Sequence, residues 1–116
     1  MTEGRSRRSP FFPVSLDVSG RPCLVVGGGP VAARKARTLV ECGGSVTVIA
    51  PSLHEDMEAL VPALQAVERR PYRRGEASAF RLVLTATGDP AVDGAVHEDA
   101  DGAGTWVNAA DDPDHS

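Results

Sequence analysis

The pattern of apolar and polar residues divides the chain into short apolar runs and longer segments with helical spacing. Five runs bounded by turn residues predict β-strands, at residues 23–26, 45–49, 67–72, 81–86 and 105–108. The run at 23–26 is apolar throughout, as expected of a parallel strand that is buried on both faces. The run at 67–72 contains Pro71 and arginines, and this composition favours an edge strand.

The segments between these runs predict helices. Residues 31–42 carry an apolar stripe, and residues 91–101 follow the fourth predicted strand as a second helix. Residues 53–64 have a weaker helical pattern, which Pro62 is expected to shorten or bend, and 76–80 is at most a turn or two. Because strands alternate with helices, the sequence predicts an α/β fold, a Rossmann-like doubly wound parallel sheet of about five strands.

Length and composition predict a single domain with an aliphatic core. The chain has 116 residues, of which 41% are apolar and only 4% aromatic. Residues 1–10 are polar and rich in Arg and Ser, so we expect a disordered tail followed by one folded domain over 11–116. No apolar run approaches the roughly 18 residues that span a bilayer. We therefore expect a soluble, cytoplasmic protein with no membrane partner.

The net charge of −4 is unevenly distributed along the chain. Residues 1–88 hold all twelve Lys and Arg with eight acids, whereas residues 89–116 hold eight acids and no Lys or Arg. We interpret the acidic part as a solvated helix face and the loop after it. The basic residues form no stripe with interleaved aromatic residues, so a nucleic-acid partner is not expected.

The sequence gives little indication of a redox or metal site at its cysteines and histidines, or of a binding site at its clustered arginines. Cys23 and Cys42 lack CxxC spacing, and both are expected to be small buried hydrophobes. The three histidines lack the spacing of metal ligands, so no metal site is predicted. The arginines at positions 69, 70, 73 and 74 are expected at the surface.

The central motif is Gly27-x-Gly29-x-x-Ala32, between the first strand and the first helix. Gly27 permits the tight turn out of the strand, Gly29 lets the backbone approach a pyrophosphate, and Ala32 keeps the helix close to the sheet. Pro30 is suited to the first helical position, and the free N–H groups at that helix end favour phosphates. The motif in this context predicts dinucleotide binding.

Two observations qualify this prediction. Methyltransferases that use S-adenosylmethionine also have such a loop, usually after an acidic residue, but apolar residues precede it here. The end of the second strand, where an acid often binds the ribose of NAD, reads Ala50-Pro51-Ser52. Because neither a carboxylate nor an arginine stands there, these residues leave the choice between NAD and NADP open.

A second constellation, Asn108-Ala109-Ala110-Asp111, lies at the end of the fifth predicted strand. Ligands of open α/β sheets bind beyond the carboxyl ends of the strands, so a carboxylate there faces the crevice and is able to accept a proton. From position alone, a loop aspartate that caps a turn is the favoured interpretation of Asp111.

Taken together, several strings resemble one family. The apolar start Phe12-Pro13-Val14, the loop Gly27-Gly28-Gly29-Pro30-Val31-Ala32-Ala33-Arg34-Lys35, the pair Ala86-Thr87 and the string Asn108-Ala109-Ala110-Asp111-Asp112-Pro113 occur in order. The chain over 11–116 is similar to the dehydrogenase module of siroheme synthases and to stand-alone precorrin-2 dehydrogenases. This resemblance implies an NAD-dependent oxidation of precorrin-2 to sirohydrochlorin, which some members follow with insertion of ferrous iron.

The resemblance also implies roles for individual residues. Asp111 falls on the family's catalytic aspartate, a general base. Arg34 and Lys35 are candidates for binding substrate carboxylates, although an exposed helix face is the favoured interpretation of both. Cofactor contacts are expected from Gly27, Gly28, Gly29, Pro30, Val31, Ala50, Pro51, Thr87 and Asn108. Family members continue past the position of Ser116 into a segment that forms a homodimer, and many carry a uroporphyrinogen-III methyltransferase domain. The chain is therefore expected to be part of a longer protein, ending before the dimerisation segment.

A regulatory module that senses NAD(H) without catalysis is the alternative hypothesis. Such a module shares the glycine loop but does not need Asn108 or Asp111. Tight NAD(H) binding without tetrapyrrole binding by the complete protein distinguishes it from the enzyme.

Overall fold

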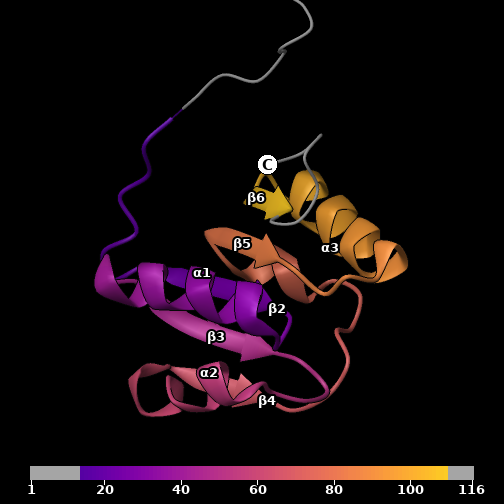
Figure 1. Cartoon of the computed structure of the whole chain (residues 1–116). Helices are drawn as coiled ribbons and strands as arrows, with labels where there is room; N and C mark the ends of the chain where they lie inside the picture. Colours follow the sequence, from indigo (N-terminus) through magenta and orange to yellow (C-terminus); the bar gives the residue numbers. More distant parts are fainter. Residues whose placement is uncertain (1–13, 110–116) are drawn as a thin grey trace, which may run out of the picture.

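The computed structural model describes residues 14–109 and contains a five-stranded sheet in the order β4-β3-β2-β5-β6 (Figure 1). Every neighbouring pair of strands is parallel. The strands are β2 (Pro22–Val26), β3 (Ser45–Ile49), β4 (Ala66–Glu68), β5 (Leu82–Thr85) and β6 (Trp106–Ala109). The predicted α/β fold class and the five-stranded parallel sheet are confirmed. The predicted tail at 1–10 lies outside the described residues.

Helices cover both faces of the sheet, and each face has its own apolar core. Alternate residues of β2 serve the two cores: Cys23 and Val25 pack on the α1 side, and Leu24 and Val26 on the α3 side. The helical elements are α1 (Pro30–Glu41), α2 (Glu55–Glu58), α3 (Pro90–Gly102) and the short 3-10 helices η1 (Val61–Ala63) and η2 (Glu76–Ala79). Both faces of β2 are buried from Cys23 to Val26, which explains the uninterrupted apolar sequence of these residues.

The single helix predicted over residues 53–64 is wrong. His54 caps a helix of one turn, with its Nδ1 accepting a hydrogen bond from the Asp56 N–H at 3.1 Å. Pro62 stands at the start of η1 instead of inside a helix, and Leu64 is already extended. Because proline has no N–H and clashes with the preceding turn, the segment breaks into two short pieces.

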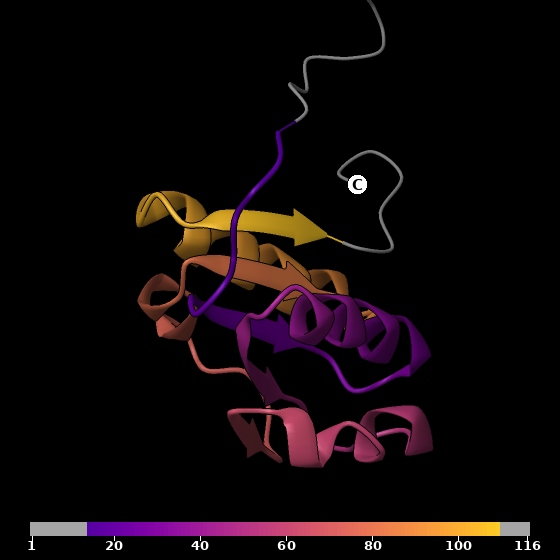
Figure 2. The same ribbon diagram turned by 90° about the vertical axis from the view of Figure 1, so that its left-hand side faces the viewer.

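The third strand is an edge strand, as predicted, but it is shorter than the range 67–72. It pairs only with β3 and covers Ala66–Glu68. The N–H of Arg70 donates to the carbonyl of Glu68 at 3.0 Å, so the chain turns directly after the strand. Figure 2 shows β4 at the edge of the sheet farthest from β6.

Ion pairs and hydrogen bonds fix the crossover between β4 and β5 against α3. The Tyr72 hydroxyl donates to Asp99 and accepts from the Ala77 N–H at 3.0 Å. Asp99 also accepts from the Gly75 N–H at 2.7 Å and from Arg74 at 3.1 Å. The interpretation of the acids after residue 88 as a merely solvated face is therefore wrong for Asp99, and it is wrong for Asp93 too, which accepts hydrogen bonds from Thr85 and Thr87.

The two cysteines differ in environment. Cys23 is fully buried, as predicted, and burial raises the pKa of its thiol. Cys42 follows the last turn of α1 and is exposed, so the prediction that both cysteines are buried is wrong. Within the described part of the chain, no helix is long and apolar enough to cross a membrane.

Candidate functional site

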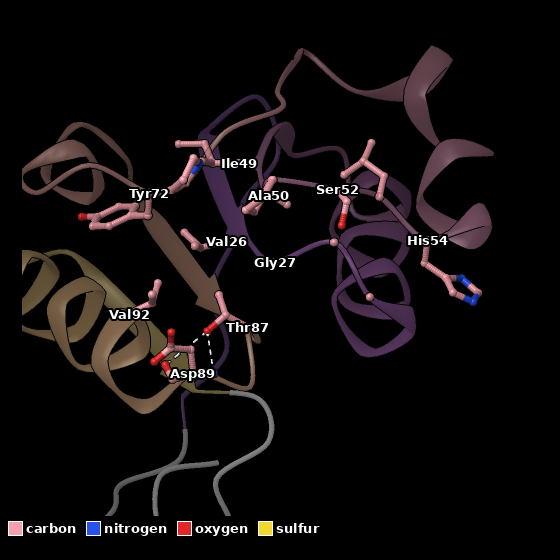
Figure 3. A pocket seen from close by; sticks show the side chains of 15 residues that line it. Val26, Gly27, Ile49, Ala50, Ser52, His54, Tyr72, Thr87, Asp89 and Val92 are labelled. Carbon is pink, nitrogen blue, oxygen red and sulfur yellow. Dashed lines mark hydrogen bonds between the residues drawn. The ribbon is translucent and has the colours of Figure 1, made fainter.

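A pocket of about 560 Å³ opens at the carboxyl ends of β2, β3 and β5 (Figure 3). The chain leaves β2 toward β3 on one side and later returns to β5 on the other, so the pocket lies at the point where the strand order reverses. Its lining consists of Val26, Gly27, Gly28, Gly29, Ile49, Ala50, Pro51, Ser52, Leu53, His54, Pro71, Tyr72, Thr87, Asp89 and Val92.

Gly27 occupies a position that no other residue fits. Its φ is +133°, and a Cβ built on it lies 2.5 Å from the backbone oxygen of Ala86. Its N–H donates to the carbonyl of Ile49 at 3.0 Å. The glycine therefore turns the chain out of β2 while lying between the ends of both neighbouring strands, as the motif predicts.

Gly28 allows the glycine loop to contact the segment after β3. A Cβ built on Gly28 lies 2.1 Å from the backbone oxygen of Ser52 and 3.0 Å from the Cβ of Ala50. The carbonyl of Gly28 accepts a hydrogen bond from the His54 N–H at 2.7 Å. The absence of a side chain at Gly28 is thus needed for packing within the protein.

Gly29 differs from both of its neighbours. It is the N-cap of α1, and a Cβ built on it meets no atom within 4 Å. Among residues 14–109, no side chain caps this helix end, and the first turn of the helix holds no acidic residue. Open space beside Gly29, together with the positive dipole of a helix end that has no side-chain cap, is an arrangement that fits an anionic group such as a phosphate.

The wall of the pocket on the β3 side is apolar. Val26, Ile49 and Ala50 are almost completely buried beneath it, and Val92 approaches from α3 (Figure 3). The described residues that line the pocket include no Lys or Arg. Tyr72 forms the far side of the wall, and its hydroxyl points away from the glycine loop toward Asp99.

Burial raises the pKa of Tyr72 to about 12, and the hydrogen bond to Asp99 adds to this shift. The phenol therefore stays neutral at physiological pH and serves as a structural donor.

Tyr72, His54, Asp89 and Val92 were not predicted as pocket residues. The Asp-Pro pair at residues 89–90 marks the start of a helix after a strand, and this signal could have placed Asp89 at the pocket. Tyr72 reaches the pocket only through the path of the chain between β4 and β5, which no local sequence pattern predicts.

The predicted cofactor residues fall into separate groups. Gly27, Gly28, Gly29, Ala50, Pro51 and Thr87 line the pocket. Pro30 and Val31 form the first turn of α1, directly after the glycine loop. Asn108 instead lines a second pocket, of about 520 Å³, together with the predicted substrate residues Arg34 and Lys35.

This second pocket lies along α1 and over β5 and β6, and Trp106 forms part of it with 47% of its surface exposed. The Oδ1 atom of Asn108 is buried, and among the described residues it has no hydrogen-bond partner. The predicted catalytic residue Asp111 lies outside the described residues. Over residues 14–109, no three His, Cys, Asp or Glu side chains form a group that could hold a metal ion.

Comparison with known proteins identifies the family. Residues 14–116 match the family described as "Putative NAD(P)-binding". The chain belongs to this family. It is 40% identical over 106 residues to a siroheme synthase of Tolumonas auensis, and 41% identical over 108 residues to one of Chromobacterium violaceum. Each alignment covers 91% of this chain but only 22% and 23% of the respective synthase.

A solved structure agrees with these similarities. The chain is similar to SirC, a precorrin-2 dehydrogenase, with a TM-score of 0.77 and 29% sequence identity, over 91% of this chain and 52% of that one. The resemblance predicted from the motifs is therefore confirmed. The chain spans about a fifth of the length of the siroheme synthases and about half of the dehydrogenase.

Proposed function

We propose that this chain binds NAD in the glycine-loop pocket and serves the oxidation of precorrin-2 to sirohydrochlorin. The observation that carries the proposal is the open space at Gly29, beside an uncapped helix end, in a chain 40% identical to a siroheme synthase. An NAD(P)-binding family and a precorrin-2 dehydrogenase as structural neighbour support the same activity.

Residues of the pocket fit the parts of a dinucleotide. The backbone N–H groups at the start of α1 would hold the pyrophosphate, with Gly29 leaving room for it. The apolar wall formed by Ile49 and Val92 suits a flat ring. Bound NAD supplies the acceptor for a hydride, and the protein orients the reacting partners.

The charges around the pocket favour NAD over NADP. A 2′-phosphate needs a cationic partner, and the lining residues within the described part of the chain offer neither Lys nor Arg. The helix next to the pocket, α2, instead has Glu55, Asp56 and Glu58 in its first turn. Glu58 is neutralised by its ion pair with Arg69, so Glu55 and Asp56 are the carboxylates that would disfavour an additional phosphate at this side of the pocket.

We assign the chemistry of the substrate to the end of β6. Asp111, which lies three residues after Asn108, serves as the general base that takes the proton lost by precorrin-2. Arg34 and Lys35 bind carboxylates of the tetrapyrrole, which is supported by their shared pocket with Asn108. The proposal includes the family's homodimer, a cytoplasmic location, insertion of ferrous iron by the same site, and fusion to a methyltransferase.

The test uses the complete protein that contains this chain. Oxidation of precorrin-2 with NAD is followed by the absorbance of sirohydrochlorin, for the wild type, Asp111→Ala and the neighbouring control Asp112→Ala. We expect Asp111→Ala to lower kcat by about 100-fold or more without loss of NADH affinity. Tight NADH binding with no sirohydrochlorin formed by the wild type would overturn the proposal and favour a sensing module.

A further inference from the structure

Asp93 links the first turn of α3 to the end of β5. Its Oδ1 atom accepts hydrogen bonds from the hydroxyl of Thr85, from the Thr87 hydroxyl at 2.7 Å and from the Thr87 N–H at 3.3 Å. Thr85 is only 1% exposed, so its hydroxyl needs this partner. Thr87, in contrast, lines the glycine-loop pocket.

The contacts of Thr87 determine which way its hydroxyl hydrogen points. The hydroxyl has a single hydrogen, and the shorter of its two acceptor contacts is the one to Asp93, at 2.7 Å against 3.3 Å to the carbonyl of Asp89. The Asp89 N–H donates to the same hydroxyl oxygen at 3.1 Å. With its hydrogen directed at Asp93, the Thr87 hydroxyl has only acceptor capacity left for a ligand.

We propose that Asp93 is a positioning residue, which fixes Thr87 as a hydrogen-bond acceptor for an N–H or O–H group of the bound dinucleotide. The inference rests on the proposed function, because it assumes that the pocket holds NAD. Ribose hydroxyls and the amide and amino groups of NAD are the donors that such an acceptor recognises. Asp93 acts on the ligand only through Thr87, and it does not line the pocket itself.

A purely structural role for Asp93 makes a different prediction. If the carboxylate only joins α3 to β5, its loss lowers stability without changing the affinity of the folded protein for NADH. If it acts through Thr87, loss of either residue weakens NADH binding, and loss of both weakens it no further. The two roles are therefore separated by a double-mutant cycle that measures affinity and stability independently.

The cycle uses a Thr85→Val background, in which Asp93→Ala leaves no buried hydroxyl without a partner. NADH affinity is measured by fluorescence titration for Asp93→Ala, Thr87→Val and the double variant. Asp101→Ala, an exposed residue of the same helix, is the control. We expect Thr85→Val and the control to stay within about twofold of the wild type, and each single variant and the double to lose about three- to tenfold.

Titration with ADP, which lacks the nicotinamide half, locates the donor. Equal losses for ADP and NADH place it in the adenosine half, and a loss for NADH alone places it in the nicotinamide half. An unchanged NADH affinity of Asp93→Ala, or losses that multiply in the double variant, would overturn the inference. A wild type that does not bind NADH refutes the proposed function instead, so the two failures are distinguishable.

Discussion

Neighbouring glycines of the loop provide a matched pair for testing the site. Gly28 and Gly29 both lie outside the left-handed φ region, so alanine meets no backbone strain at either position. They differ in what the new methyl group contacts. At Gly28 it lies 2.1 Å from the oxygen of Ser52, whereas at Gly29 it meets no atom within 4 Å.

The magnitudes follow from these distances. Normal carbon–oxygen contact requires more than 3 Å, so Gly28→Ala forces the backbone at Ser52 to move by about 1 Å, at a cost of about 1–3 kcal/mol. For a domain of this size, that cost lowers Tm by about 5–20 °C. Gly29→Ala adds no steric clash, because its methyl group points into open space, but alanine is a poorer N-cap than glycine, so we expect a smaller cost of about 0.5–1 kcal/mol.

For cofactor affinity, Gly29→Ala is the variant that is expected to have a direct effect. The methyl group of Gly29→Ala occupies the space expected for the pyrophosphate, and overpacking by about 1–3 kcal/mol weakens NADH binding about 5- to 150-fold. Thermal unfolding and NADH titration of both variants test this. The reasoning is refuted if Gly29→Ala keeps wild-type affinity, or if it destabilises the fold as much as Gly28→Ala does.

Three further predictions concern the fold around the pocket. Tyr72→Phe removes the acceptor of the buried Ala77 N–H and a donor to Asp99, so chemical denaturation is expected to show a loss of about 1–3 kcal/mol. The hydrogen bond from Tyr72 is the largest cause that lowers the pKa of Asp99, so this carboxylate stabilises the fold above its usual pKa of 3.8. The stability that Asp99 contributes is lost as the pH falls through its lowered pKa. The stability that neutral Tyr72 contributes is complete below pH 10 and is lost as the pH rises through its pKa of about 12. Tyr72→Phe is therefore expected to flatten both the acidic and the alkaline end of the pH–stability curve. A thiol reagent is expected to modify the exposed Cys42 in the native protein and the buried Cys23 only on unfolding, and early modification of both would contradict the described core.

The sequence predicted those features that depend on local pattern and on chain order. The uninterrupted apolar run at 23–26 predicted β2, and the apolar stripe over 31–42 predicted α1, with Pro30 marking the start of this helix. The glycine spacing identified the pocket because the motif assigns Gly27 to the tight turn after the strand and Gly29 to the close approach of a phosphate. These arguments need no knowledge of distant contacts.

Tertiary contacts account for what the sequence did not predict. Tyr72 lies in the pocket because Asp99, 27 residues later, accepts its hydrogen bond. Asn108 shares a pocket with Arg34 because residues of α1 and of the strands β5 and β6 line the same hollow, which no spacing in the sequence shows. The break near Pro62 was predicted only in part, because the cap at His54 and the burial of Met57 fix where the short helix begins and which face it packs, and the sequence pattern shows neither.

A crystal structure of this chain with NAD tests the central claim most directly. We expect the pyrophosphate within hydrogen-bond distance of the N–H groups at the start of α1, beside Gly29, and a ring of the dinucleotide against Ile49 and Val92. NAD bound in the second pocket over β5 and β6, or anywhere else away from the glycine loop, would contradict the account.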